Sequence, residues 1–211
     1  MATSAPWTGH TEKGKQMRLL VGLAALFTMV TGYGCAHPIV LTPDLVTLDR
    51  TTVTPISKNV GYYISPAERA KEVTTAGGGG DKVRYFPYKD LEPALQKVLS
   101  NLFERVYSMP TGNDAAFIAD KHIRFVFVPE IDTKSSSSSA FTWPPTSFTI
   151  YLNCAAMDPS GKTLWQKRIE ATGEAEFSEF KADVSLSAKR AAQKAFGELQ
   201  QELNGAPEFR Q

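Results

Sequence analysis

The stretch that decides the fold is Ser147-Phe-Thr-Ile-Tyr-Leu152, followed by the turn Asp158-Pro-Ser-Gly161 and by Thr163-Leu-Trp-Gln-Lys-Arg-Ile169. The first segment alternates apolar and polar side chains, as a strand does when one face of its sheet is covered. The turn is specific because proline presets one backbone dihedral and glycine supplies a positive one. The two flanking strands are therefore predicted to form an antiparallel hairpin.

Other strands are indicated by β-branched and aromatic content. They are Val60–Ile64, Val83–Phe86 and Ile123–Val128, and the segment Glu174–Phe177 extends the meander beyond the hairpin. Between the first two strands lies Gly77-Gly-Gly-Gly80, which invites comparison with a phosphate-binding loop. Such a loop needs a following Lys-Ser/Thr pair and a helix. A strand pattern follows instead, so a flexible turn is the preferred interpretation.

Two segments carry apolar residues at helical spacing. One covers residues 91–107, with Asp90 as its cap, and the other covers residues 186–203 and is rich in alanine, which would let it lie close to a sheet. Leu99 and Phe196 are predicted core residues of these helices. Together with the strands, the helices predict an α+β fold: an antiparallel sheet of four to five strands with two helices packed on one face.

The N-terminus has the order of a secretory signal. Lys13, Lys15 and Arg18 precede an apolar run over residues 19–30, and small residues then lead to Cys35. A helix that spans a bilayer needs about 20 apolar residues, and this run is shorter, so a permanent membrane anchor is not expected. Translation could start at Met1 or at Met17, and the sequence leaves this open.

Two reactions could follow export. In the first, Cys35 is diacylated and becomes the first residue of a lipoprotein, whose acyl chains hold the protein on a membrane. Ala36 after the cysteine resembles the sorting signal of outer-membrane lipoproteins. In the second, an ordinary signal peptidase cleaves the chain, and Cys35 is free to form a disulfide with Cys154, the only other cysteine. Lipidation is the preferred prediction.

The sequence divides into four parts. Residues 1–34 are predicted as the signal peptide, and residues 35–58 as an extended tether that follows the lipidated Cys35, because this segment is rich in proline and lacks a periodic pattern. Residues 59–204 form a single α/β domain, and residues 205–211 form a C-terminal tail. The tether would let the domain stand away from the membrane.

Charge argues against a nucleic-acid partner. Removing Lys13, Lys15 and Arg18 from the 23 basic residues, and Glu12 from the 22 acidic ones, leaves a mature charge near −1. Binding to a phosphate backbone requires clustered lysine and arginine, and neither predicted helix carries a basic stripe free of acidic residues. The expected partners are therefore a membrane, through the lipid anchor, and an envelope protein.

The residues that usually carry catalysis or bind metals are scarce. The mature chain has only two histidines: His37 lies in the predicted tether, and His122 has no cysteine or carboxylate at ligand spacing. Cys154 has no basic neighbour in sequence that would lower its pKa. Glu174 and Glu176 share a strand face, but a catalytic carboxyl group needs a cleft that buries it. We therefore expect no enzyme activity, no catalytic residues, no metal site and no cofactor.

The segment Asp132–Pro145 is the predicted interaction site. Its serine run cannot bury enough surface to order itself, yet Phe141 and Trp143 lie within it beside two prolines. Aromatic side chains of this kind concentrate binding energy at interfaces. Phe141 and Trp143 are therefore the candidate partner-binding residues. The alternative is that both rings fold back and cover the core of the domain.

The order of these parts resembles the YajG-like family of small Gram-negative envelope lipoproteins: a signal and Cys35, the helix Leu91–Phe103, a hairpin at Ser160-Gly161-Lys162, then Gly173–Phe177 and an alanine-rich helix. The layout is more loosely similar to the lipopolysaccharide-assembly lipoprotein LptE. The resemblance implies a non-catalytic outer-membrane accessory lipoprotein that faces the periplasm and binds or positions a partner in an envelope assembly or transport complex. The alternative is a periplasmic small-molecule or glycan-binding module.

Overall fold

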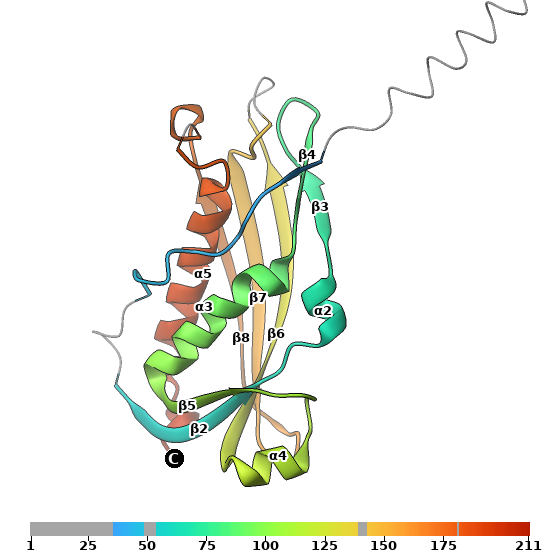
Figure 1. The fold of residues 1–211 in the computed structure, drawn as a ribbon. Coiled ribbons are helices and arrows are strands. Elements are labelled where there is room, and N and C mark those ends of the chain that lie inside the picture. Colours follow the sequence, from blue (N-terminus) through green and yellow to red (C-terminus); the bar gives the residue numbers. More distant parts are fainter. Residues whose placement is uncertain (1–35, 49–53, 139–142, 181) are drawn as a thin grey trace, which may run out of the picture. The chain divides into compact units, whose positions relative to one another are not determined.

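A computed structural model of the chain describes residues 36–48, 54–138, 143–180 and 182–211 (Figure 1). The predicted signal peptide, Cys35 and Phe141 lie outside the described residues. Residues 36–211 belong to one compact unit. The domain therefore begins well before residue 59 and continues beyond residue 204, where the sequence predicts its limits.

A five-stranded sheet forms the centre of the fold. Its strands lie side by side in the order β5-β2-β6-β7-β8, with β6, β7 and β8 antiparallel and β2 parallel to both of its neighbours. The predicted α+β class is confirmed, and the sheet is mixed because the long connection between β2 and β5 returns the chain in the same direction. The bounds are β2 Ile56–Tyr62, β5 Phe103–Ser108, β6 Ile123–Ser136, β7 Ser147–Met157 and β8 Thr163–Glu174.

The hairpin between β7 and β8 forms where the sequence predicts it. Gly161 has a φ of +86°, and its amide donates to the carbonyl of Asp158 at 2.9 Å. A smaller sheet, ordered β1-β4-β3, lies beside the first and consists of β1 Ala36–Pro38, β3 Val73–Ala76 and β4 Lys82–Tyr85. The glycine-rich segment closes the turn between β3 and β4, where Gly79 and Gly80 both have positive φ.

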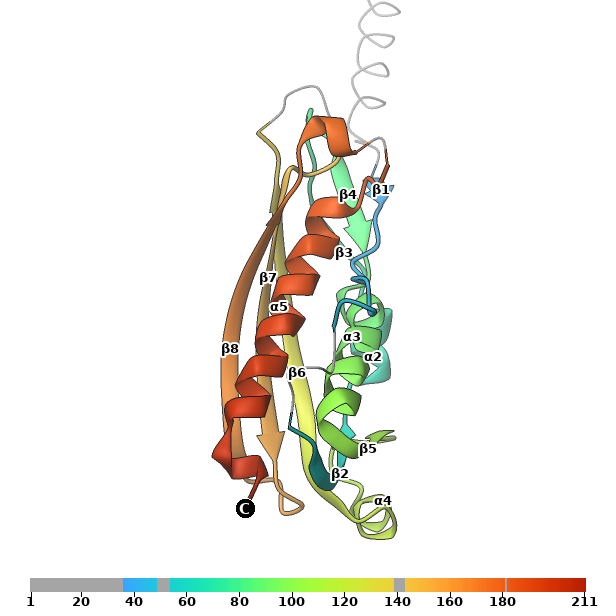
Figure 2. The same ribbon diagram turned by 90° about the vertical axis from the view of Figure 1, so that its left-hand side faces the viewer.

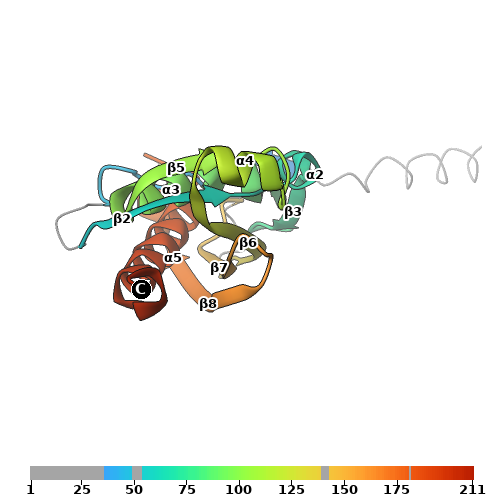
Figure 3. The ribbon, with the colours of Figure 1, turned by 90° about the horizontal axis from the view of Figure 1, so that it is seen from below.

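Two long helices cover one face of the large sheet (Figure 2). They are α3, Pro87–Leu102, and α5, Leu186–Gly205; seen from below, α5 lies in the curve between β8 and the pair β2–β5 (Figure 3). Leu99 and Phe196 are buried, as predicted. The shorter elements are α2 Pro66–Ala70, α4 Ala115–Asp120 and the 3-10 turns η1 Phe177–Glu179 and η2 Pro207–Phe209.

The first long helix ends earlier than the sequence predicts. The apolar pattern over residues 91–107 continues past Leu102, but Phe103–Ser108 is strand β5, which pairs with β2. Val106 and Tyr107 suit a strand because their bulky or branched side chains restrict helical rotamers. The helix pattern thus runs directly into a strand whose first residue, Phe103, is also buried.

The predicted tether is wrong over residues 36–48, because this segment packs against the domain. Ile39, Leu41 and Leu48 are buried in the main core. The amide of Leu41 donates to the Asp90 carboxylate at 3.2 Å, and burial raises the pKa of Asp90. Asp90 therefore holds this segment instead of capping the helix, which begins at Pro87. Asn101 secures the far end of the segment by donating to the carbonyl of Leu48 at 2.9 Å.

The C-terminal residues also belong to the core. Phe209, placed by sequence analysis in a tail, is fully buried and packs its ring against Phe103, Phe125 and Trp165. Its ring lies 5.1 Å from that of Phe125, centroid to centroid, with an edge-to-face angle of 79°. Such aromatic pairs add to the free energy of burial. Residues 205–211 therefore close the lower end of the domain.

The alanine-rich helix lies close to the sheet at one glycine. A methyl group on Gly173 of β8 would overlap the backbone carbonyl of Ser187 and the amide nitrogen of Ala191 on α5. On the helix side, Ala188, Ala191, Ala192 and Ala195 are fully buried. The absence of a side chain on the strand and the small side chains on the helix together let the two backbones approach.

Replacing Gly173 with alanine should therefore destabilise the domain, because backbone atoms of α5 must move to admit the methyl group. We expect a loss of about 1–3 kcal/mol or more in the free energy of unfolding, measured by chemical denaturation. Gly197→Ala on the same helix is the matched control. Its added methyl meets nothing within 4 Å, so it should stabilise the helix by about 0.5–1 kcal/mol. Equal effects of the two substitutions would contradict the packing argument.

Candidate functional site

The large sheet has two chemically different faces. Along β7, Phe148, Ile150, Leu152 and Cys154 are fully buried, whereas the residues between them are partly exposed. The register carries the same alternation onto β6 and β8. Because successive side chains of a strand point to opposite faces, the apolar set lies under the helices and the other set points away from them.

The face that points away from α3 and α5 is covered only at its lower end. There Val126 packs with Ile118 of α4, and Val128 lies at the margin of this small cluster. Above Val128, no helix of the described ranges lies over the sheet (Figures 2 and 3). We call this surface the open face; its side chains are Glu130, Asp132, Lys134, Thr149, Tyr151, Asn153, Gln166, Arg168 and Glu170.

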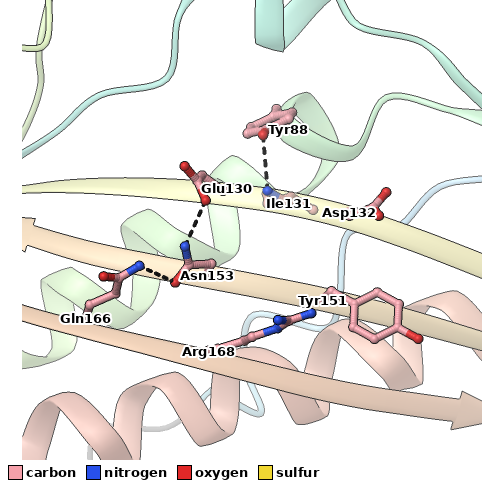
Figure 4. A pocket seen from close by; sticks show the side chains of 8 residues that line it. All are labelled: Tyr88, Glu130, Ile131, Asp132, Tyr151, Asn153, Gln166 and Arg168. Carbon is pink, nitrogen blue, oxygen red and sulfur yellow. Dashed lines mark hydrogen bonds between the residues drawn. The ribbon is translucent and has the colours of Figure 1, made fainter.

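A shallow hollow of about 610 Å³ lies at the centre of the open face (Figure 4). Three strands and the start of α3 contribute to it. Its lining residues are Tyr88, Glu130, Ile131, Asp132, Tyr151, Asn153, Gln166 and Arg168. The hollow is therefore bordered by two aromatic rings, two amides and charges of both signs, a set that can form hydrogen bonds to a ligand in several directions.

Asn153 organises the polar side chains of the hollow. Its amide nitrogen donates to the Glu130 carboxylate at 2.8 Å, and its amide oxygen accepts from Gln166 at 2.9 Å (Figure 4). These bonds join β6, β7 and β8 across the strands. They also fix the orientation of the Asn153 amide, because its donor and its acceptor each have a partner of the matching kind. The three side chains are therefore held in place before any ligand binds.

Tyr151 and Arg168 occupy the middle of the open face. Tyr151 lies between Asp132 and Glu170 in the strand register, and Arg168 pairs in register with Asn153. Tyrosine and arginine are the side chains that most often carry the binding energy of protein interfaces. Tyr151 presents a flat ring with a polar tip, and Arg168 presents a planar fork of donors.

Tyr88 closes the hollow on the side of α3. Its hydroxyl accepts a hydrogen bond from the backbone amide of Ile131 at 3.1 Å, at a point on β6 beyond the last pair with β2. Burial raises the pKa of Tyr88, so the hydroxyl stays protonated. It satisfies a backbone donor that would otherwise lack a partner at the edge of the sheet.

The carboxyl groups on the open face are exposed and lie on separate strands. Asp132 and Glu170 flank Tyr151 from two different strands, which places their backbones two strand spacings apart, about 10 Å. Both side chains belong to exposed residues. A catalytic carboxyl group requires a cleft that buries it, and a shallow polar surface does not provide one.

The structure places one of the two predicted partner-binding residues. Trp143 is half-buried, and its ring stacks on His37 with centroids 4.3 Å apart and an angle of 23°. Its carbonyl accepts from the amide of Gly78 at 2.9 Å. Trp143 therefore folds back onto the small sheet, as the alternative interpretation expects of both rings. Phe141 lies outside the described residues.

The other residues considered from sequence also have defined places. Cys154 is a free cysteine that is fully buried under the helices, and burial raises its pKa to about 12. His37 approaches Asp81 at 3.4 Å, and His122 precedes β6 with a φ of +50°. No group of three or more potential metal ligands occurs in the described ranges. Within the same ranges, no helix combines the length and apolar character needed to cross a membrane.

Sequence analysis missed most of the open face. It treated the segment from Asp132 onwards as a loop, whereas β6 continues to Ser136 and pairs with β7 along its whole upper half. The sequence did carry a signal, because charged Asp132 and Lys134 alternate with Ile131, Thr133 and Ser135, which are buried in the structure. Pro129 and the serine run concealed it, because proline and serine usually mark the end of a strand.

Comparison with known proteins gives matches among solved structures only. No family model matches the chain, and no curated protein matches it. Among solved structures, a Xanthomonas campestris protein of family DUF330 is 12% identical, with 82% of this chain and 92% of that chain covered and a TM-score of 0.43. The PelC dodecamer from Paraburkholderia phytofirmans is 12% identical, with 71% and 91% covered and a TM-score of 0.43.

A candidate lipoprotein from Caulobacter crescentus is 14% identical, with 63% of this chain and 85% of that chain covered and a TM-score of 0.33. With TM-scores below 0.5, these likenesses assign neither a family nor a function to the chain. None of the three is described as a YajG-like protein or as LptE, so that resemblance stays a prediction.

The position of Cys154 yields a test of its chemistry. A maleimide should not modify Cys154 in the folded protein at neutral pH, because the thiol is buried and its thiolate form is strongly disfavoured. Unfolding in denaturant should make it react at the rate of an ordinary cysteine. Ser178→Cys, at an exposed position, is the positive control for the folded state. Rapid modification of Cys154 without unfolding would contradict its placement in the core.

Proposed function

We propose that the chain is a non-catalytic accessory lipoprotein of the bacterial outer membrane, which faces the periplasm and binds a protein partner through the open face. The observation that carries this proposal is the ordered polar surface around Tyr151 and Arg168, on the side of the sheet that α3 and α5 leave uncovered. On the other face of the sheet, packing in the hydrophobic core explains the choice of side chains. Core packing does not explain an ordered set of polar side chains that faces solvent.

The composition of the open face favours a protein partner. Lys134 and Arg168 stand against Glu130, Asp132 and Glu170, so the surface is nearly balanced in charge. Tyrosine and arginine at the centre with charged residues around them is the arrangement of an interface core and its polar rim. The surface is too polar and too shallow for the mostly apolar pocket that a small apolar ligand requires.

A second candidate function is glycan binding. The specific observation in its favour is that Asn153, Gln166 and Arg168 present planar hydrogen-bonding groups beside the ring of Tyr151 in a hollow of about 610 Å³. That volume lies within the usual range for small-ligand sites. The two candidates make different demands on Tyr151, because a sugar would stack on its ring, whereas a protein interface would distribute its contacts over the whole open face.

The open face is tested by reversing one charge. Arg168→Glu should weaken binding of the native partner, recovered by crosslinking and purification from membranes, by about 2 kcal/mol, or roughly thirtyfold in Kd, because arginine at an interface centre is commonly a hot spot. Arg105→Glu is the matched control, since Arg105 is also an exposed strand arginine but lies on β5. The folded state should survive in both variants, which circular dichroism and thermal melting check.

Three outcomes separate the possibilities. Partner loss in the Arg168 variant alone supports the protein-binding proposal. Equal recovery of the partner with both variants contradicts it. If no protein is recovered but the purified domain binds cell-wall oligosaccharides, and Tyr151→Ala abolishes that binding, the glycan candidate replaces it.

Lipidation at Cys35 is tested separately. The sequence order of basic residues, an apolar run and small residues before Cys35 supports modification. Metabolic labelling with a fatty-acid analogue should mark the wild-type protein and should not mark Cys35→Ser, which should accumulate in the soluble fraction because the protein loses its acyl chains. An unlabelled wild-type protein that carries a disulfide between Cys35 and Cys154 would favour plain secretion.

A further inference from the structure

The chain joins the folded domain immediately after Cys35. Strand β1 starts at Ala36, which pairs in parallel with Lys82 of β4. Consecutive Cα atoms are 3.8 Å apart, so the peptide bond from Cys35 to Ala36 joins any acyl anchor to the β1–β4 pair without a spacer. The segment that follows cannot serve as a flexible spacer, because the backbone amide of Val40 donates to the Ser185 hydroxyl at 3.1 Å and Leu41 is fully buried.

Several segments gather at the same end of the domain as Ala36. The turn between β3 and β4 lies there, with Gly78 donating to the carbonyl of Trp143. The upper ends of β6, β7 and β8 meet it, since Ser135 hydrogen-bonds to the carbonyl of Ala76 and Ser147 pairs with Glu174. The chain then enters η1. Figures 1 and 2 agree in placing these segments at the top of the domain.

This end of the domain carries aromatic side chains that are not fully buried. Phe177 in η1 is 65% exposed, the most exposed aromatic among the large hydrophobic residues of the described ranges. Trp143 is half-buried and stacks on His37. The exposed charges are of both signs, Lys82 against Glu174 and Glu176. Aromatic rings suit the headgroup level of a bilayer, whereas attraction to anionic lipids would need clustered basic residues.

We propose that this end of the domain, marked by Ala36, Trp143 and Phe177, rests on the phospholipid surface and that the long strands stand away from it. The proposal rests on the lipidation of Cys35 that forms part of the proposed function. It goes further, because lipidation alone through a flexible tether would leave the domain free to turn. Here the residue after the attachment point already belongs to strand β1, so the anchor limits the orientation of the domain.

The orientation has a consequence for the open face. Strand β7 has 11 residues, Ser147–Met157, which at about 3.3 Å per residue amounts to roughly 36 Å. The hairpin turn at Asp158–Gly161 therefore lies far from the membrane, and the open face between the two ends is reachable from the periplasm. A partner would approach along the membrane plane and not through the bilayer.

Two tryptophans at opposite ends of the domain provide the test. Trp143 lies at the proposed membrane end, and Trp165 lies two residues into β8, beside Phe209. The full lipidated protein is reconstituted in vesicles of phosphatidylethanolamine and phosphatidylglycerol, with and without brominated acyl chains. In Trp165→Phe, brominated lipid should quench the fluorescence of Trp143. In Trp143→Phe, the fluorescence of Trp165 should be unchanged.

A second measurement avoids changing the aromatic residues. Ser178→Cys and Lys162→Cys place exposed thiols beside Phe177 and in the hairpin turn, and the buried Cys154 does not compete for the label. A polarity-sensitive dye at position 178 should shift its emission to shorter wavelength on vesicles, and the same dye at position 162 should not shift. Raising the salt concentration should leave the difference intact, since the contact is not electrostatic.

The outcomes distinguish this inference from lipidation itself. If the protein is labelled by the fatty-acid analogue and floats with vesicles, but Trp143 is not quenched and the dye at position 178 does not shift, the orientation is overturned and lipidation stands. If the two tryptophans are quenched equally, the domain has no fixed orientation, which also overturns the inference. Failure to label or to float contradicts lipidation and therefore the premise.

Discussion

The close approach of α5 to β8 at Gly173 is the constraint on which the rest of the structure depends. The helix can lie directly on the strand only where the strand lacks a side chain and the helix offers alanines. This contact decides which face of the hairpin is covered. Because side chains alternate along a strand, the opposite face points away from α5, and its polar residues become a surface of the finished fold.

A second set of contacts determines how the chain enters the domain. Asp90 and Asn101 of α3 bind the backbone of residues 41 and 48, and Asn101 also donates to Gln200 of α5 at 2.7 Å. Asn101 thus joins both helices to the N-terminal segment, and Asp90 adds a second contact from α3. Buried polar groups of this kind must be satisfied, so the segment cannot detach without exposing unpaired donors and acceptors. The same contacts that complete the core therefore leave residues 41–48 unable to act as a flexible membrane tether.

Local patterns in the sequence were sufficient for some of the fold and not for the rest. The hairpin at Asp158–Gly161 and the buried stripe of α5 follow from periods of two and of about 3.6 residues, which neighbouring residues reveal. Strand β5 pairs with β2, 46 or 47 residues earlier in the chain, and its parallel pairing leaves no local signature. Residues 36–48 were misread for a similar reason: their partners lie on β4, on α3 and at Ser185, just before α5. In sequence, the polar residues of the open face look like those of any solvated strand. Only the structure shows that Asn153 forms hydrogen bonds with both Glu130 and Gln166.

The β8 edge of the sheet is partly protected against the addition of a strand from another chain. Strand β8 ends the sheet, and an exposed edge would present free carbonyl groups to another chain. Near the upper end, Lys194 donates to the carbonyl of Thr172 and Arg190 donates to that of Glu174, both at 2.8 Å. These side chains come from α5, so the helix that covers one face of the sheet also caps part of its edge. A partner strand would have to displace two charged hydrogen bonds there, whereas side chains such as Tyr151 and Arg168 are accessible without any rearrangement of the fold.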